Sequence, residues 1–335
     1  TAVMVYGDGG KGAVGYLVGE ENRGLEYMFI MMNAARYAVG VQGIAVAERA
    51  YQQAVAYAKD RVQSRPVDGS AKESVAIIHH PDVQRMLLTM RALIEGARAM
   101  ALVGAAAYDN AHNNPDAAAA KQAQAFYEFL VPLIKGFSTE NSVEVTSLGV
   151  QVHGGMGFIE ETGAAQYYRD SRILPIYEGT TAIQANDLVG RKTARDGGAV
   201  AKAIAAQIAE VEAQLAGRDS AACKKFASQL KAARESFLQV VDFVLANVKS
   251  NPNAVFAGSV PYLMLTANLV AGWQMGRSLI IAEDKLAAGE DGAFMTAKIA
   301  TARFYGDHIL ARVASLRDTI LNGGESVTAM PLDAF

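Results

Sequence analysis

The chain has 335 residues, enough for two domains of ordinary size, and 51% of them are hydrophobic. That content can fill a core and excludes an intrinsically disordered protein. The net charge is −3 with scattered lysines and arginines, whereas nucleic-acid-binding proteins concentrate positive charge on one face. The single cysteine, Cys223, excludes an intrachain disulfide, and no apolar run reaches the length of a membrane span. We therefore expect a cytoplasmic protein with no nucleic-acid partner and no membrane span.

The N-terminal residues differ from the rest of the chain. They show neither a start methionine at position 1 nor a signal-peptide pattern, so we expect the chain to begin partway through a longer protein. Residues 2–20 have two β-favouring runs separated by Gly7-Asp8-Gly9-Gly10, which predicts strand, turn and strand. A lone hairpin is marginally stable in water, so we interpret residues 1–23 as the remnant of a larger β domain.

From Gly24 onward, apolar residues recur at helical spacing. One long stripe continues to Tyr57 and a loop follows at about residues 61–74, after which Pro81 suits the first turn of a second helix. A third helical segment follows residues 113–116, and we expect Gly136 to kink or break it near Phe137. It ends at residues 153–157, a fourth helix lies within residues 161–170, and a fifth begins near Tyr177.

A boundary is predicted at Asp196-Gly197-Gly198. Four further helical stretches follow, at about residues 199–216, 220–249, 255–288 and 291–322. Short connections between antiparallel neighbours are typical of helical bundles. The predicted fold class is therefore all-α, with one bundle over residues 24–196 and a second over residues 197–335.

The common catalytic and metal-binding patterns are missing from the sequence. There is no Cys-x-x-Cys, His-Glu-x-x-His, Gly-x-Ser-x-Gly or phosphate-binding glycine loop, and no Glu-x-x-His pair for a di-iron bundle. The adjacent His79 and His80 point to different faces of regular structure, so we interpret them as residues that flank a helix start.

Two short segments could carry chemistry. In Gln151-Val152-His153-Gly154-Gly155-Met156-Gly157-Phe158, three glycines follow an apolar helix. Such glycines ordinarily form a helix C-cap and tight turn, but they also let bare backbone approach a ligand.

The second segment places Glu178 among apolar residues, directly before Gly179 and two hydroxyl residues. One interpretation is an N-terminal capping cluster in which the helix dipole favours the carboxylate. The other is a catalytic base, because apolar neighbours such as Ile176 and Tyr177 would desolvate the carboxylate and make it a stronger base for a weak carbon acid.

Together these segments resemble the acyl-CoA dehydrogenases. That family combines a Gln-x-x-Gly-Gly-x-Gly-Phe/Tyr turn with a Tyr-Glu-Gly-Thr stretch some twenty residues later, and an Arg-Asp pair lies between them, here Arg169-Asp170. The resemblance covers residues 1–196. Residues 197–335 look like the extra helical domain of a long bacterial branch of the family, whose members also have preceding helical and β domains.

The resemblance implies an α,β-dehydrogenation of an acyl-CoA thioester to the trans-2-enoyl-CoA. Glu178 matches the base that removes the α-proton, and FAD accepts a hydride from the β-carbon. A flavin ribityl hydroxyl and the backbone N–H of the base polarise the thioester carbonyl, in the manner of an oxyanion hole.

The resemblance also implies binding roles for other residues. Arg61, Gln63 and Ser64 match a segment that reaches the FAD of a neighbouring subunit, and Gln151, Gly154 and Gly155 match the turn that holds the adenosine half of FAD, also across a subunit interface. Thr180 matches a contact to FAD phosphate, whereas Asn33, Arg36 and Gly179 are assigned to the acyl-CoA substrate. Four residues depart from the family pattern, namely Asn33, Ser64, Arg65 and Ala182.

The partners implied by the resemblance are acyl-CoA, an electron-transfer flavoprotein as acceptor, and further copies of the chain in a homodimer or larger homo-oligomer. An acyl-CoA oxidase remains an alternative, because it differs only in passing electrons to oxygen. A non-catalytic helical oligomerisation module is the alternative from another class. We expect the chain alone to be inactive, since most of the flavin and substrate pocket would lie in the missing domains.

Overall fold

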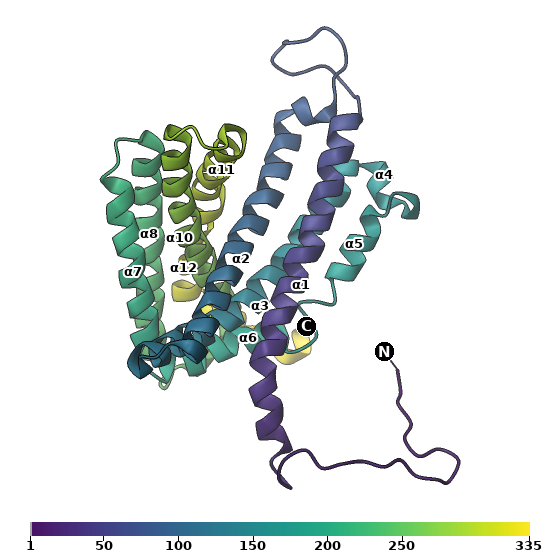
Figure 1. Cartoon of the computed structure of the whole chain (residues 1–335), viewed down its shortest axis with the longest axis vertical. Coiled ribbons are helices and arrows are strands. Elements are labelled where there is room, and N and C mark those ends of the chain that lie inside the picture. The colour runs from purple at the N-terminus through teal and green to yellow at the C-terminus, as the bar shows by residue number, and fades with distance from the viewer. Residues whose placement is uncertain (1) are drawn as a thin grey trace.

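Three long helices form the first half of the protein. The computed structural model describes residues 2–335, except for the side chains of Phe29 and Ile30. Helices α1 (Gly24–Asp60) and α2 (Pro81–Asn113) both pack along α3 (Ala117–His153) (Figure 1). The Asp116 side chain caps α3 by accepting a hydrogen bond from the Ala118 backbone N–H at 2.8 Å. A short 3₁₀ turn, η1 (Ile77–His79), precedes α2.

The chain then returns along this layer in short elements. They are α4 (Gly155–Phe158), η2 (Glu160–Thr162), α5 (Ala164–Ser171), α6 (Thr181–Asp187) and the π-helical η3 (Leu188–Ala194). Helix α5 packs against α1 and α3, and α6 packs against α3. The turn between α5 and α6 carries Glu178.

The second half is also helical. It comprises α7 (Ala199–Ala216), α8 (Ala221–Asn247), α9 (Pro252–Ala257), α10 (Ser259–Ala287), α11 (Gly292–Phe304), η4 (Tyr305–Leu310), α12 (Arg312–Asn322), α13 (Gly324–Val327) and η5 (Leu332–Ala334). Helix α10 packs against α8, α11 and α12 and also against α2, α3 and α6. A single hydrophobic core cluster therefore extends from Ile44 in α1 to Ile320 in α12.

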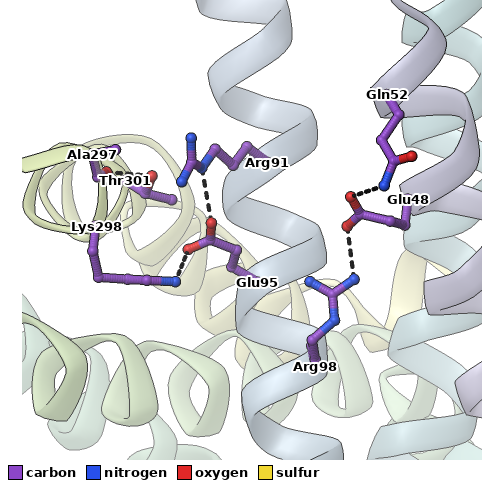
Figure 2. A network of polar contacts seen from close by, with 8 residues as sticks. All are labelled: Glu48, Gln52, Arg91, Glu95, Arg98, Ala297, Lys298 and Thr301. Atoms are coloured by element: carbon purple, nitrogen blue, oxygen red, sulfur yellow. Dashed lines mark hydrogen bonds and ion pairs between the residues drawn. The ribbon is translucent and has the colours of Figure 1, made fainter. Parts of the chain in front are cut away.

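Charged side chains link the first half of the protein to the second. The Glu95 carboxylate on α2 accepts hydrogen bonds from Arg91 at 2.8 Å and from Lys298 on α11 at 2.6 Å (Figure 2). On the other side of α2, Arg98 donates to Glu48 on α1 at 2.7 Å (Figure 2). These contacts link α1, α2 and α11 in series.

Helices α1 and α3 approach each other closely at two glycines. A Cβ on Gly40 would lie 2.7 Å from the Ile134 carbonyl oxygen, and one on Gly43 would lie 2.7 Å from the Ser138 carbonyl oxygen. Only glycine permits these backbones to come so near. The close contact fixes the position of α1 relative to the part of α3 that lies against the Glu178 turn.

The structure corrects three local predictions. The hairpin of residues 2–20 does not form: no strand occurs in residues 2–23, and nearly all of their side chains are exposed, so no neighbouring sheet holds them. Their origin in a β domain stays a prediction. Gly136 does not break α3, because it lies inside the packed core, where a Cβ would meet Leu263 at 2.8 Å. The fifth helix begins at Thr181, since Tyr177–Thr180 form a turn.

One helix in the described part of the chain, α1, is long and apolar enough to cross a membrane, with a mean hydropathy of 1.2 over its most apolar window. Core helices and signal sequences meet the same criterion, so a single such helix is weak evidence for a span. Here α1 packs along α3 and carries a buried arginine, Arg36.

Candidate active site

One cavity gathers the residues that follow the two long helices. Its volume is about 600 Å³. Of the predicted cofactor-binding residues, six line it: Arg61, Gln63, Ser64, Gln151, Gly154 and Gly155. The structure therefore brings the loop after α1 and the glycine turn after α3 together, and their role in cofactor binding stays a prediction.

The loop side of the cavity is held by backbone hydrogen bonds. The Gln63 N–H donates to the Val75 carbonyl at 2.9 Å, and the Val75 N–H donates to the Ser64 carbonyl at 3.0 Å. Ser64 has a φ of 61°, in the left-handed region. These backbone hydrogen bonds therefore shape the loop, and Arg61, which directly follows the last residue of α1, lines the cavity.

The opposite side is the glycine turn that ends α3. Gly154 has φ 59° and ψ −137°, a conformation that residues with a side chain rarely adopt. A Cβ on Gly154 or Gly155 would meet no atom within 4 Å, so their backbone faces open space. Gly157, by contrast, is packed, because a Cβ there would lie 2.3 Å from the Val150 carbonyl oxygen.

Two aromatic groups that the sequence analysis did not select also line this cavity. The rings of Tyr57 and His153 stack with centroids 4.4 Å apart, and His153 Nδ1 lies 2.7 Å from the Gly149 carbonyl. His80 flanks the start of α2, as predicted, and its Nε2 lies 2.7 Å from the Gln63 carbonyl. Tyr57 lies one helical turn before Arg61, and this spacing could have predicted that both residues line the same cavity.

Glu178 lies on the strained turn before α6. Its φ is 55°, one of four positive values among the non-glycine residues described. The Tyr177 hydroxyl donates to the Gln42 side chain on α1, and the Thr181 N–H donates to the Pro175 carbonyl at 3.0 Å. Strain of this kind persists only where the surroundings enforce it.

The predicted desolvation of Glu178 is not provided by its own chain. The residue is exposed, and its neighbour Ile176 is itself 48% exposed. Any water-excluding cover of this carboxylate would have to come from a ligand or from another polypeptide.

A buried lysine lies beneath this turn. The Lys135 side chain on α3 has no exposed surface, and its ammonium donates to the carbonyls of Leu174 at 2.9 Å and Gly179 at 2.7 Å. Desolvation lowers the pKa of Lys135 to about 8; the charges of Glu140 and Glu178 oppose the shift and that of Arg36 adds to it. The sequence analysis missed Lys135, because one lysine within an apolar helix has no local signature.

The lowered pKa of Lys135 predicts a pH-dependent stability. Between about pH 8 and pH 10.5 the unfolded chain holds a proton on this amine that the folded chain does not. The free energy of unfolding should therefore rise with pH across this window. Thermal unfolding of the wild type and of Lys135→Met would measure it, and the wild type should gain stability relative to the variant as pH rises. A constant or falling difference would contradict the assignment.

The two predicted substrate residues on α1 lie in different surroundings. Arg36 is buried and paired with Asp187 of α6 at 3.5 Å, so its guanidinium holds the helices together. Asn33 lines a separate cavity of about 730 Å³ with Tyr108 and Tyr127. Arg36 lies one helical turn from Asn33 but does not line that cavity, and the contacts of both residues to a substrate stay a prediction.

The cavity at the glycine turn and the turn that carries Glu178 lie at different positions along the axis of α1. Gln42, which contacts the Glu178 turn, precedes the cavity residue Tyr57 by 15 positions. At 1.5 Å per residue these positions are about 22 Å apart along the helix. Thr180 belongs to the Glu178 group, where its side chain caps α6 by accepting from the Ile183 N–H at 3.3 Å.

Two families match the chain. The family described as acyl-CoA dehydrogenase, C-terminal domain, matches residues 22–193, just over half of the chain, and the family described as acetyl-CoA dehydrogenase C-terminal like matches residues 201–331. The chain belongs to the acyl-CoA dehydrogenase family.

Relatives of known name extend this result. The chain is 57% identical to a 3-methylmercaptopropionyl-CoA dehydrogenase from Ruegeria pomeroyi, over 99% of this chain and 55% of that protein. It is 33% identical to a broad-specificity linear acyl-CoA dehydrogenase from Mycobacterium tuberculosis, over 96% of this chain and 54% of that protein. The chain therefore spans about half the length of the curated relatives it matches.

Solved structures show the same fold. An acyl-CoA dehydrogenase from Bacillus anthracis, solved with FAD, matches with a TM-score of 0.72 at 21% identity, over 92% of this chain and 52% of that one. ACDH-11 from Caenorhabditis elegans, solved with C11-CoA, matches with a TM-score of 0.72 at 16% identity, over 93% of this chain and 50% of that one.

Proposed function

We propose that this chain is the C-terminal part of a flavin-dependent acyl-CoA dehydrogenase. The observation that carries the proposal is the grouping of the family's motif residues into two places. Six residues assigned to FAD line one cavity, whereas Glu178, Gly179 and Thr180 share a rigid turn elsewhere.

The residues around the cavity fit FAD. The Arg61 guanidinium offers fixed donors to a pyrophosphate or ribose oxygen, and Gln151 offers an amide. The open backbone at Gly154 and Gly155 permits close approach, while Tyr57 offers an aromatic face. When bound, FAD would supply the oxidising group that accepts a hydride from the acyl β-carbon.

Glu178 would act as the base that removes the α-proton. Its carboxylate is exposed on a turn whose backbone is held by Lys135 and whose Tyr177 side chain is held by Gln42. A bound acyl chain would cover the carboxylate and exclude water, which strengthens its attraction for the proton. The Gly179 backbone beside it would contact the substrate.

The separation between the cavity residues and the Glu178 turn favours a homo-oligomer. Two sites about 22 Å apart along α1 would serve two different flavins. We propose a homodimer or larger homo-oligomer in which the cavity of Arg61 and Gln151 completes the site that contains Glu178 of a neighbouring subunit. An electron-transfer flavoprotein would be the acceptor, and the cytoplasm the location.

Anaerobic mixing of the full-length protein with acyl-CoA thioesters tests the function. We expect the flavin absorbance to bleach and the product to be lighter by two hydrogens. The substrates should include 3-methylmercaptopropionyl-CoA and linear acyl-CoAs, after the relatives of known name. A flavin that stays oxidised with every thioester would contradict the proposal. Rapid oxygen uptake during aerobic turnover would instead identify an acyl-CoA oxidase.

The chain of 335 residues by itself should hold FAD weakly and lack dehydrogenase activity. It offers few of the contacts a dinucleotide needs, and losing one charged hydrogen bond costs about 1.5–3 kcal/mol, a tenfold or larger loss of affinity. The measurement is the visible spectrum after mixing with excess FAD and desalting. A yellow protein with one flavin per chain, or bleaching by acyl-CoA, would contradict this prediction and show that the helical part suffices.

A further inference from the structure

The search for unassigned chemistry leads to Lys135. All lysines of the chain lie in its described part, and Lys135 is the one whose side chain is buried. A lysine rarely occupies a core, because taking an ammonium out of water is costly. Such a residue calls for an explanation that packing alone does not give.

The contacts of Lys135 are specific. Its ammonium donates to two carbonyls, Leu174 at 2.9 Å and Gly179 at 2.7 Å, which bracket the segment that contains Glu178. The Gly179 carbonyl also accepts from the buried Gln184 amide at 3.2 Å. One cation therefore ties both ends of a six-residue turn to α3.

The turn needs such a tie. Glu178 and Gly179 have φ values of 55° and 86°, so two consecutive residues are left-handed. A non-glycine residue in this region is strained and stays there only if the surroundings hold it. Without the Lys135 ammonium, the Leu174 carbonyl would lose this donor and the Gly179 carbonyl would keep only the longer hydrogen bond from Gln184.

We propose that Lys135 is a positioning residue, which clamps the turn and so sets the place and direction of the Glu178 carboxylate. The inference rests on the proposed role of Glu178 as base. Lys135 acts through the backbone of the turn and is remote in sequence, on the middle of α3. Glu140, Arg36 and Glu178 are the charged groups around its ammonium; the two carboxylates oppose the desolvation and Arg36 adds to it, and the pKa is lowered to about 8.

The clamp predicts a kinetic effect of a particular kind. A base displaced by about 1 Å can lose on the order of a hundredfold in rate without loss of binding. Proton removal from the α-carbon should suffer more than hydride removal from the β-carbon. The kinetic isotope effect of α-deuterated substrate should therefore rise, while that of β-deuterated substrate falls.

The test compares Lys135→Met with the wild type in the full-length protein. Lys192→Met is the matched control, since it removes an ammonium that is largely buried and paired at 2.8 Å with Glu128, which lies about two turns before Lys135 on α3. Two measurements are made: flavin reduction by acyl-CoA with the isotope effects, and hydrogen–deuterium exchange of peptides covering residues 174–181. Exchange needs no catalysis, so it reports the clamp even if the assignment of Glu178 or of the activity fails.

In Lys135→Met we expect faster exchange in residues 174–181, flavin reduction slowed about ten- to a hundredfold and retained FAD, whereas Lys192→Met should match the wild type in all three. Unchanged exchange and rate in Lys135→Met would overturn the proposal. So would a slower rate with both isotope effects unchanged, because the base would then not be the affected group. Where Lys135→Met fails to fold, Lys135→Gln replaces it with the same expected and overturning results.

Discussion

Replacing Glu178 with glutamine in the full-length protein should leave FAD bound and lower the rate of flavin reduction by acyl-CoA about 10²–10⁴-fold. The amide cannot take up the α-proton, and a positioned base contributes a factor of this size. Glutamine is nearly isosteric and meets the same backbone strain at φ 55°, so the turn itself should be preserved. Stopped-flow absorbance at saturating substrate measures the effect.

The control for this experiment is Glu160→Gln. Glu160 is an exposed carboxylate in a surface ion pair with Arg169, and its loss should not alter flavin reduction. If Glu178→Gln bleached as fast as the wild type, Glu178 would not be the base.

Gly43→Ala should destabilise the chain, by up to about 2 kcal/mol net. The new Cβ would lie 2.7 Å from the Ser138 carbonyl oxygen and 2.9 Å from its carbon, and these are backbone atoms that cannot swing away. Helix α1 would have to move off α3, and overpacking of this kind costs about 1–3 kcal/mol. The intrinsic preference of helices for alanine offsets about 1 kcal/mol at most. Chemical denaturation of the wild type and the variant, fitted with a common m-value, would measure the loss of unfolding free energy.

Gly149→Ala is the matched control within α3. A Cβ there would meet its nearest neighbours at an ordinary 3.7 Å. The substitution should leave stability unchanged or raise it slightly through helix propensity. Equal stability of Gly43→Ala and Gly149→Ala would show that the α1–α3 contact is loose.

Most helices could be predicted from the sequence, because the apolar spacing, Pro81 and the glycines at residues 154–157 act locally. The errors arose where tertiary contacts decide. Gly136 is a helix breaker in isolation but lies at a close contact with α10. The segment before Gly24 has residues suited to a hairpin but no sheet beside it in the structure, and it forms no strand.

The residues of the candidate site also fall into those that local sequence indicates and those that depend on tertiary contacts. Motif residues such as Arg61 and Gln151 could be found from sequence, since the family pattern places them. Lys135 could not, because its meaning depends on two carbonyls about forty residues away in the chain. The burial of Arg36 against Asp187 depends likewise on how α1 and α6 meet. A contact to a backbone carbonyl has no sequence signature, because every residue has such a carbonyl.

The continuous core has a consequence for how this chain could have evolved. Since α10 shares its apolar residues with α2, α3 and α6, the second group of helices is not a detachable accessory. A shorter relative could not be made by deleting it, because the bared surface of the first three helices would require new polar residues at many positions together. Insertion and loss of this segment should therefore be accompanied by coordinated substitutions on those helices, and chimaeras that exchange it between relatives should fail unless the contacting faces are exchanged with it.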